Sequence, residues 1–262
     1  MRLSRARVLR WAMVGTVVLA IFHAARTPSL SREWDDDVRV LAGVGLSDDG
    51  AVRLRDIRDW SYTRDSIVSR VYFDARFDPG DIVDVWMYEQ QLDDVGLISH
   101  TFLVFEFDES YGPSRYLGLS VETRRESDEE YSIIGGMLRA FEVTHIWATE
   151  RDLVTRRVQY LDYPLTRYRL VIPVEYRARI FVKLARETQE LAHTPRWYNT
   201  ALNNCTSSLI RYVNESEPGA IPLHYSYVFT GRVDNYLKKL GYLDPSYSLA
   251  ITRDYLATHD LR

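Results

Sequence analysis

Cysteine is almost absent from this chain of 262 residues, which contains one, Cys205. A single cysteine excludes an intramolecular disulfide and a cysteine-rich metal site. The chain also has no His-x-x-x-His pair, no Cys-x-x-Cys motif and no phosphate-binding glycine loop. Because these are the usual signatures of zinc and nucleotide sites, we expect no metal and no cofactor.

Acidic residues outnumber basic residues outside the N-terminus. The net charge is -4, and residues 1–25 carry four arginines and no acid, so the remainder has a charge of about -8, obtained as -4 minus 4. A body of that charge offers no electrostatic footprint for nucleic acid, which we exclude as a partner. The hydrophobic content of 46% is nevertheless that of a globular domain with a real core.

A long apolar run occurs only at the N-terminus, where an arginine-rich segment precedes the uncharged residues 11–25. This order is typical of an export signal. The run is short for a membrane span, which needs about 20 apolar residues, although ~17 can suffice. It lacks a small-x-small cleavage site, which favours a signal anchor over a cleaved signal peptide. A buried N-terminal helix of a soluble protein is a third alternative.

The distribution of basic residues places the N-terminus in the cytoplasm and the rest of the chain outside. We therefore predict a bacterial inner-membrane protein that is held by residues 8–25 and has its domain in the periplasm. It would be purely periplasmic if the N-terminal segment were cleaved. Residues 1–33 form the anchor or signal peptide plus a linker, and residues 34–262 form the domain.

The remaining chain predicts an α+β fold in which an antiparallel sheet packs against helices. Residues rich in valine and aromatics, or alternating apolar and polar, predict strands. The predicted strands are 51–55, 59–63, 70–77, 82–88, 99–107, 115–124, 152–159 and 165–172. Segments 131–139 and 141–148 fit a helix followed by a strand. Helical spacing predicts further helices over 173–193, from Cys205 to Val213, and over 229–240.

The predicted hairpin of 99–107 and 115–124 places a histidine beside a carboxylate. If its loop is symmetric, paired residues sum to 222, and His100 lies opposite Glu122 on the same face. A register slip would bring Ser120 or Arg124 opposite instead. A carboxylate beside an imidazole fixes the tautomer and stabilises the imidazolium, so Glu122 is a candidate orienting group.

The segment around Cys205 predicts a nucleophile at the start of a helix. Asn203 and Asn204 are strong N-cap residues, and apolar residues follow at helical spacing. Because free N–H groups and the helix dipole favour an anion there, the pKa of the thiol is expected to fall. The alternative interpretation is a buried cysteine that acts as a small hydrophobic residue.

A thiol nucleophile needs a base, and His100 is the best of the six histidines. His193 ends a predicted helix, His145 lies in an apolar strand, and His224 lies in an aromatic loop. Gly118–Glu122 begins like a serine nucleophile elbow but lacks its closing glycine. The candidates for contacting substrate or oxyanion are Ser120, Asn203, Asn204 and Thr206.

Several of these motifs together resemble the Lnb N-terminal periplasmic domain family. They are Ser-His-Thr-Phe at 99–102, Leu-Ser-Val-Glu at 119–122, Trp-Tyr-Asn-Thr at 197–200 and Asn-Asn-Cys-Thr at 203–206, and the similarity spans roughly residues 34–215. Lnb is a bacterial lipoprotein N-acyltransferase, and the family is similar to circularly permuted papain-like enzymes, in which the histidine strand precedes the cysteine helix. The resemblance implies that Cys205 is the nucleophile and His100 its base.

Three functions remain open at this point. The leading one is a membrane-anchored acyltransferase that forms a thioester on Cys205 and acts on a membrane lipid or lipoprotein ester. The second is a papain-like peptidase or amidase, a hydrolase of envelope peptides. The third is a non-catalytic envelope-binding or assembly module.

Overall fold

A single mixed sheet organises the described part of the chain. The computed structural model describes residues 11, 13–15, 26–200, 202–259 and 261. Its strands are β1 Gly43–Leu46, β2 Val52–Tyr62, β3 Ile67–Phe77, β4 Ile82–Gln91, β5 Ser99–Phe107, β6 Tyr116–Arg124, β7 Glu142–Thr149, β8 Leu165–Leu170 and β9 Leu243–Ile251. Its α-helices are α2 Asp36–Arg39, α3 Ile133–Met137, α4 Glu150–Thr155, α5 Val174–Leu191, α6 Cys205–Ser216, α7 Val233–Lys239 and α8 Arg253–Thr258.

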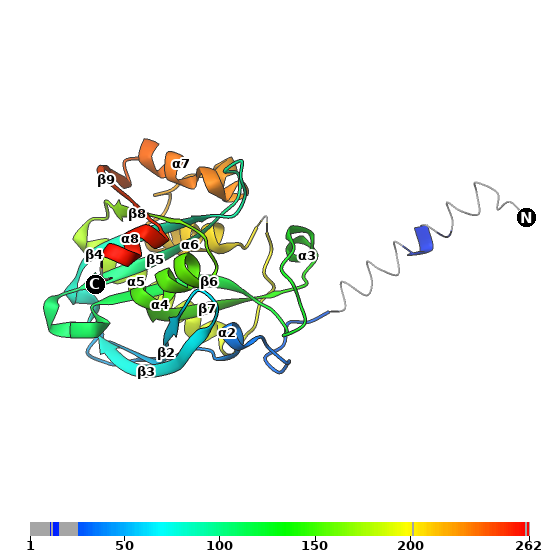
Figure 1. The fold of residues 1–262 in the computed structure, drawn as a ribbon, viewed down its shortest axis with the longest axis horizontal. Coiled ribbons are helices and arrows are strands. Elements are labelled where there is room, and N and C mark those ends of the chain that lie inside the picture. The colour runs from blue at the N-terminus through cyan, green and yellow to red at the C-terminus, as the bar shows by residue number, and fades with distance from the viewer. Residues whose placement is uncertain (1–10, 12, 16–25, 201, 260, 262) are drawn as a thin grey trace, which may run out of the picture.

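The strand order is β1-β2-β7-β6-β5-β4-β8-β9, and β3 pairs with β2 beside this path. Each described pairing is antiparallel except the short contact between β2 and β7. The predicted α+β class, with an antiparallel sheet packed against helices, is therefore confirmed (Figure 1).

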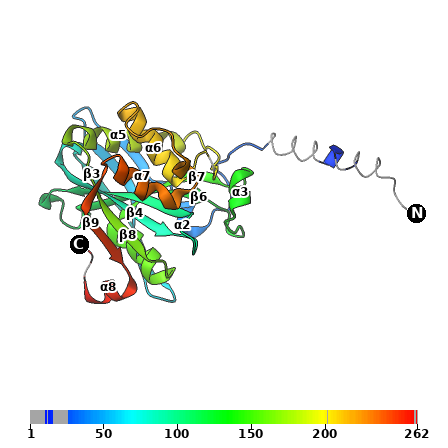
Figure 2. The ribbon, with the colours of Figure 1, turned by 90° about the horizontal axis from the view of Figure 1, so that it is seen from above.

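Helices cover both faces of the sheet. The larger core lies under α5, α6 and α7, which gather on one side of the sheet in Figure 2. The smaller core lies under α4, the π-helical turn η3 Arg156–Tyr160 and α8. Strand β5 serves both cores, because Leu103 and Phe105 point to the first and Phe102 and Val104 to the second.

The β5–β6 hairpin has the predicted register. Phe102 pairs with Ser120 and Leu103 with Leu119, and both pairs sum to 222. The described β5–β6 pairing begins at Phe102 and Ser120, whereas β6 stays paired with β7 as far as Arg124 and Glu142. The two strands of the hairpin therefore part at Ser99–Thr101.

The predicted strand at 152–159 is wrong, because this segment forms α4 and η3. Thr149 caps α4 by accepting a hydrogen bond from the Asp152 N–H, and the first turn is acidic. Leu153, Val154 and Val158 all pack into the smaller core, which a helix allows and a strand of alternating faces does not.

Other elements differ from prediction in smaller ways. The strands predicted at 51–55 and 59–63 are one strand, β2, which is interrupted by a bulge at Asp56, where φ is 57°. Strand β9 and helix α8 were not predicted. The linker expected within residues 1–33 packs against the domain at its end, since the Ser29 N–H donates to Glu142 and Arg32 pairs with Glu126.

The predicted membrane anchor, residues 8–25, lies outside the described residues except for 11 and 13–15. Among the described residues, no helix has the length and apolar character needed to cross a membrane.

Candidate active site

Cys205 is the first residue of α6, as predicted, and its helix start is heavily capped. The Asn204 side chain accepts a hydrogen bond from the Ser207 N–H at 2.7 Å, and the Ser207 hydroxyl accepts one from the Asn204 N–H at 2.9 Å. The Asn204 amide also donates to the carbonyl oxygens of Thr200 and Tyr227. This capping box fixes the direction in which α6 presents Cys205.

The thiol lies where β5 and β6 part. Cys205 Sγ is 4.0 Å from the Ser99 carbonyl oxygen, and the Thr101 N–H donates a hydrogen bond to the sulfur. If the hairpin continued to Thr101, that N–H would donate to a carbonyl of β6 instead. The opened strand ends therefore make room for Cys205 beside His100.

His100 is held from its other side by β6 and η3. Its Nε2 lies 2.8 Å from Ser120 Oγ and 3.3 Å from Glu122 Oε1, and the Ser120 hydroxyl donates to Glu122 at 2.7 Å. Arg157 Nη2 lies within 3.1 Å of all three, and it is nearest to Glu122 at 2.6 Å. Because these groups occupy Nε2, the ring nitrogen available to Cys205 is Nδ1.

Electrostatics within this group favour a thiolate–imidazolium pair. Burial opposes charge on His100, but Glu122 and Cys205 raise its pKa to about 9. Burial likewise opposes the thiolate, yet the charge and hydrogen bond of His100, with the Thr101 N–H, lower the pKa of Cys205. The pKa of Glu122 falls well below its usual value because His100 and Arg157 outweigh its burial.

The group opens into a cleft of about 330 Å³. Its walls include Ser99, His100, Glu122, Tyr198, Asn204 and Cys205, and its rim includes Arg125, Tyr131, Arg156 and Tyr163. The Cys205 side chain is buried, with 4% exposed, but it lies on the wall of this cleft. A substrate carbonyl could therefore approach the sulfur from the cleft.

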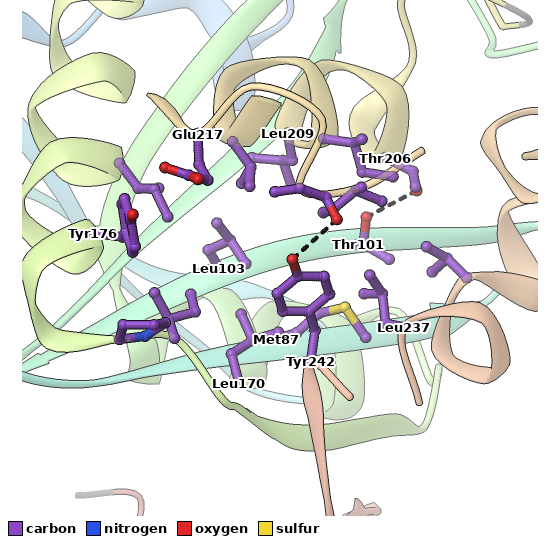
Figure 3. A pocket seen from close by; sticks show the side chains of 18 residues that line it. Met87, Thr101, Leu103, Leu170, Tyr176, Thr206, Leu209, Glu217, Leu237 and Tyr242 are labelled. Carbon is purple, nitrogen blue, oxygen red and sulfur yellow. Dashed lines mark hydrogen bonds between the residues drawn. The ribbon is translucent and has the colours of Figure 1, made fainter. Parts of the chain in front are cut away.

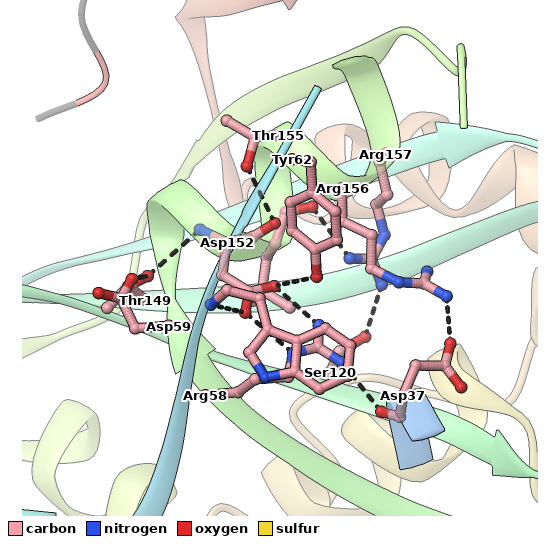
Figure 4. A network of polar contacts seen from close by, with 12 residues as sticks. Asp37, Arg58, Asp59, Tyr62, Ser120, Thr149, Asp152, Thr155, Arg156 and Arg157 are labelled. Carbon is pink, nitrogen blue, oxygen red and sulfur yellow. Dashed lines mark hydrogen bonds and ion pairs between the residues drawn. The ribbon is translucent and has the colours of Figure 1, made fainter. Parts of the chain in front are cut away.

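A buried ionic network supports the arginine side of the site (Figure 4). Arg58 binds both carboxylate oxygens of Asp152, at 2.8 and 2.9 Å, and Asp152 also accepts from the Trp60 N–H and the Tyr62 hydroxyl. Asp152 has no exposed surface and belongs to α4, which leads directly into η3. The network therefore anchors the turn that carries Arg157.

Two of the remaining predicted residues have structural roles. Asn203 donates to the Trp197 carbonyl and accepts from the Ser208 hydroxyl. Ser120 has no exposed surface and bridges His100 to Glu122, so it lies in the site as a linking hydroxyl. Thr206 is different, because its hydroxyl pairs with that of Thr101 at 3.0 Å on the face of the sheet that α5, α6 and α7 cover.

His145 and His224 make other contacts in the described structure. His145 is buried against Thr188, and burial lowers its pKa to about 3. His224 caps a short turn and stacks on Tyr236. Among the described residues, no group of three or more acidic, histidine or cysteine side chains could hold a metal ion.

Arg157 was missed in the sequence. It lies in a segment with alternating basic and apolar residues, which predicted a strand. The capping pattern Thr149-Glu150-Arg151-Asp152 could have predicted a helix, which would have turned Arg157 towards the sheet.

The fold and the site define an α+β domain with a buried Cys–His–carboxylate group. The model of the Lnb N-terminal periplasmic domain family matches residues 70–231, and the chain belongs to this family. The match runs from β3 to the short turn before α7 and includes His100, Glu122 and Cys205. Membership makes this a domain associated with the cell envelope. Neither a curated protein nor a solved structure matches the chain.

Proposed function

We propose that this protein is a periplasmic thiol acyltransferase that takes an acyl group from a membrane lipid or lipoprotein ester. The observation that carries the proposal is the geometry at the split hairpin, where a capped helix start presents Cys205 to a histidine already bound to a carboxylate. The order of the histidine strand before the cysteine helix supports a circularly permuted papain-like arrangement.

The residues suit acyl transfer through a thioester. The Cys205 thiolate attacks the ester carbonyl carbon, so that a sulfur–carbon bond forms while the ester carbon–oxygen bond breaks. His100 gives its proton to the departing alkoxide. An amine then attacks the thioester and gives a proton to His100, and the sulfur leaves as a thiolate while the acyl group departs as an amide, which restores the thiolate–imidazolium pair. Backbone N–H groups at the start of α6 would hold the oxyanion.

A lipid partner is supported by exposed apolar residues beside the cleft. Ile134 and Leu138, in and after α3, have 71% and 56% of their surface exposed, and Leu202, three residues before Cys205, has 79%. The Asn199 amide donates to the Met137 carbonyl, which ties the loop before Cys205 to α3. The described chain from Arg26 onwards starts near the same end of the molecule as α3 (Figure 1). We propose that residues 8–25 hold the protein in the inner membrane at this end.

The proposal is tested by trapping the acyl-enzyme. The full chain is incubated with phospholipid vesicles or with a diacylglyceryl-cysteine peptide, quenched in acid, and its intact mass is measured. We expect a mass increase of one fatty acyl group in the wild type and none in Cys205→Ala. His100→Ala should acylate about 10²–10⁴-fold more slowly, since it lacks the base, whereas His259→Ala, an exposed side chain after α8 that does not line the cleft, should match the wild type.

Two outcomes would contradict the proposal. A peptidyl adduct on Cys205 in the presence of envelope peptides, with no acyl adduct, would indicate a peptidase or amidase. Complementation of a deletion strain by Cys205→Ala and His100→Ala would indicate a non-catalytic module.

A further inference from the structure

A second, apolar cavity lies on the side of β5 that α5, α6 and α7 cover, and the hydroxyl groups of Thr101 and Thr206 pair in its wall (Figure 3). Its volume is about 230 Å³. The Thr206 hydroxyl is 3.9 Å from Cys205 Sγ and 3.0 Å from the Thr101 hydroxyl, and both threonines line the cavity. The cavity therefore begins next to the nucleophile.

The cavity follows α6 from its first turn to its end. Thr206, Leu209, Ile210, Val213 and Glu217 line it, and they form one stripe along the helix. Eleven steps of about 1.5 Å make this stripe about 16 Å long. The cavity is thus elongated, with one end at the thiol and the other at Glu217.

The opposite walls are apolar and come from several elements. Met87 and Leu103 form the sheet side, Ile180 comes from α5, and Leu237 comes from α7. Among the described residues that line the cavity, Glu217 alone carries a charge, and it lies at the end away from the thiol. Apolar hollows of this size, with few polar groups in their walls, are typical of small-molecule binding sites, so this cavity indicates a ligand.

The lining selects the chemistry of that ligand. A peptide would bring backbone N–H and C=O groups that need hydrogen-bond partners when buried. The threonine hydroxyls already bond each other, and the Tyr242 hydroxyl donates to the Ala220 carbonyl. An alkyl chain makes no such demand. An apolar cavity of about 150 Å³ binds benzene, so the larger volume here has room for a chain of more than six carbons.

We propose that this cavity, called the acyl cavity below, binds the unbranched alkyl chain of the acyl group that passes through Cys205. The assignment rests on the proposed function for the position of the carbonyl end, at the sulfur. The Thr101–Thr206 hydroxyl pair then separates the cavity from the cleft and must open when a chain enters from the thiol.

Binding is measured first without catalysis. The full-length Cys205→Ala protein is titrated calorimetrically with butanoate, octanoate, dodecanoate and hexadecanoate. Each buried methylene should strengthen binding about fourfold until the cavity is filled, after which the affinity should level off. An affinity that does not change with chain length would overturn the proposal.

Two variants locate the binding site. Leu209→Trp fills the acyl cavity from α6 and should weaken dodecanoate binding at least about tenfold. Val213→Phe, at a partly exposed position of the same stripe, provides a gentler obstruction should the first variant fold poorly. Leu240→Trp adds the same side chain at an exposed position after α7 and should bind like the parent. Equal affinities in all variants would place the chain elsewhere and overturn the assignment.

A kinetic comparison separates this inference from the proposed function. Wild-type protein is acylated with p-nitrophenyl acetate and with p-nitrophenyl dodecanoate. We expect faster acylation by dodecanoate, lost in Val213→Phe while the acetate rate is kept. Equal rates from both esters would keep the thiol chemistry and refute the acyl cavity. Chain-length-dependent binding without acylation of Cys205 would support the cavity and refute the transferase.

Vesicles and a diacylglyceryl-cysteine peptide, used in turn as donors, then distinguish the two sources of the chain.

Discussion

Glu122 interacts with two cations, and this division sets the charge state of the site. Its carboxylate lies 2.6 Å from Arg157 and 3.3 Å from His100, so it remains ionised while it stabilises the imidazolium. Among the groups that raise the pKa of His100, the charge of Glu122 has the largest effect. The thiolate of Cys205 depends on that imidazolium, so Glu122 acts on the sulfur through His100.

Glu122→Gln should therefore move the pH at which the thiolate forms. Without the carboxylate, the pKa of His100 should fall from about 9 towards its ordinary value, and the pKa of Cys205 should rise. We expect a shift of at least about one pH unit, which corresponds to about a tenfold loss of thiolate below the transition. Ultraviolet absorbance of the thiolate follows this directly, because the chain contains one cysteine.

The control for this experiment is a carboxylate remote from the thiol. Glu109 has 90% of its side chain exposed and pairs only with Arg115 in the described structure, so Glu109→Gln should leave the thiolate curve unchanged. A thiolate curve for Glu122→Gln that coincides with that of the wild type would show that Glu122 does not tune the pair.

At the scale of single elements, local patterns predicted some features well and others poorly. The β5–β6 register followed from the length of the loop between the strands and from the alternation of side chains along each strand. It correctly placed Glu122 beside His100. The start of α6 followed from Asn204, whose cap is local. Features that depend on distant partners were not predictable in this way. Arg157 lies in a turn that follows α4, and α4 is anchored by the pair between its Asp152 and Arg58 of the distant strand β2.

Strand β7 and helix α5 are joined by a histidine that must stay neutral. The Thr188 hydroxyl donates to the Leu184 carbonyl, so it accepts from His145 Nδ1 and from the Trp147 indole. His145 therefore carries its proton on Nδ1, and Nε2 is buried without a hydrogen-bond partner in the described structure. A second proton on this ring would be a buried charge.

His145 should make the fold sensitive to acid. Burial lowers its pKa from 6.5 to about 3, so the unfolded state binds more protons between these values. The free energy of unfolding should fall by up to about 1.4 kcal/mol per pH unit as the pH drops below 6.5. His145→Phe should be less sensitive over this range in urea unfolding at a series of pH values.

His100 provides the contrast for that measurement. Its pKa is raised to about 9, so its stabilising effect is complete below 6.5 and is lost as the pH rises through 9. His100→Ala should therefore change the alkaline side of the stability curve and leave the acid side to His145. Equal acid slopes in wild type and His145→Phe would contradict the role given to His145.

At the scale of the whole molecule, the site, the acyl cavity and the exposed apolar residues all lie near the end of the sheet where β5 and β6 part. The cleft opens where β5 and β6 part, and the cavity begins behind the Thr101–Thr206 pair. The α3 segment projects at the end of the sheet where β6 finishes and β7 starts. Two arginines lie at this end of the molecule. Arg139, which is exposed, follows α3, and Arg26, which is partly exposed, lies over the ring of Trp197. Asp128 and Glu130, which precede α3, are exposed as well, so the tip carries both charges, and its exposed apolar side chains are what suits it to a lipid headgroup layer.

Substitutions in α3 should therefore weaken lipid binding while leaving the chemistry at Cys205 intact. In a chain that begins at Arg26, so that residues 8–25 do not contribute, Ile134→Ser with Leu138→Ser removes two exposed apolar side chains. Burying each in a bilayer is worth about 1.5 kcal/mol or more, so co-sedimentation with phospholipid vesicles should fall by more than about tenfold. Val68→Ser with Val71→Ser, on β3, removes side chains with 62% and 50% exposure from another part of the surface and should have no effect.

Acylation by a water-soluble ester should be the same in both pairs, because neither touches the cleft. Equal losses of vesicle binding in the two pairs would show that α3 has no special contact with lipid.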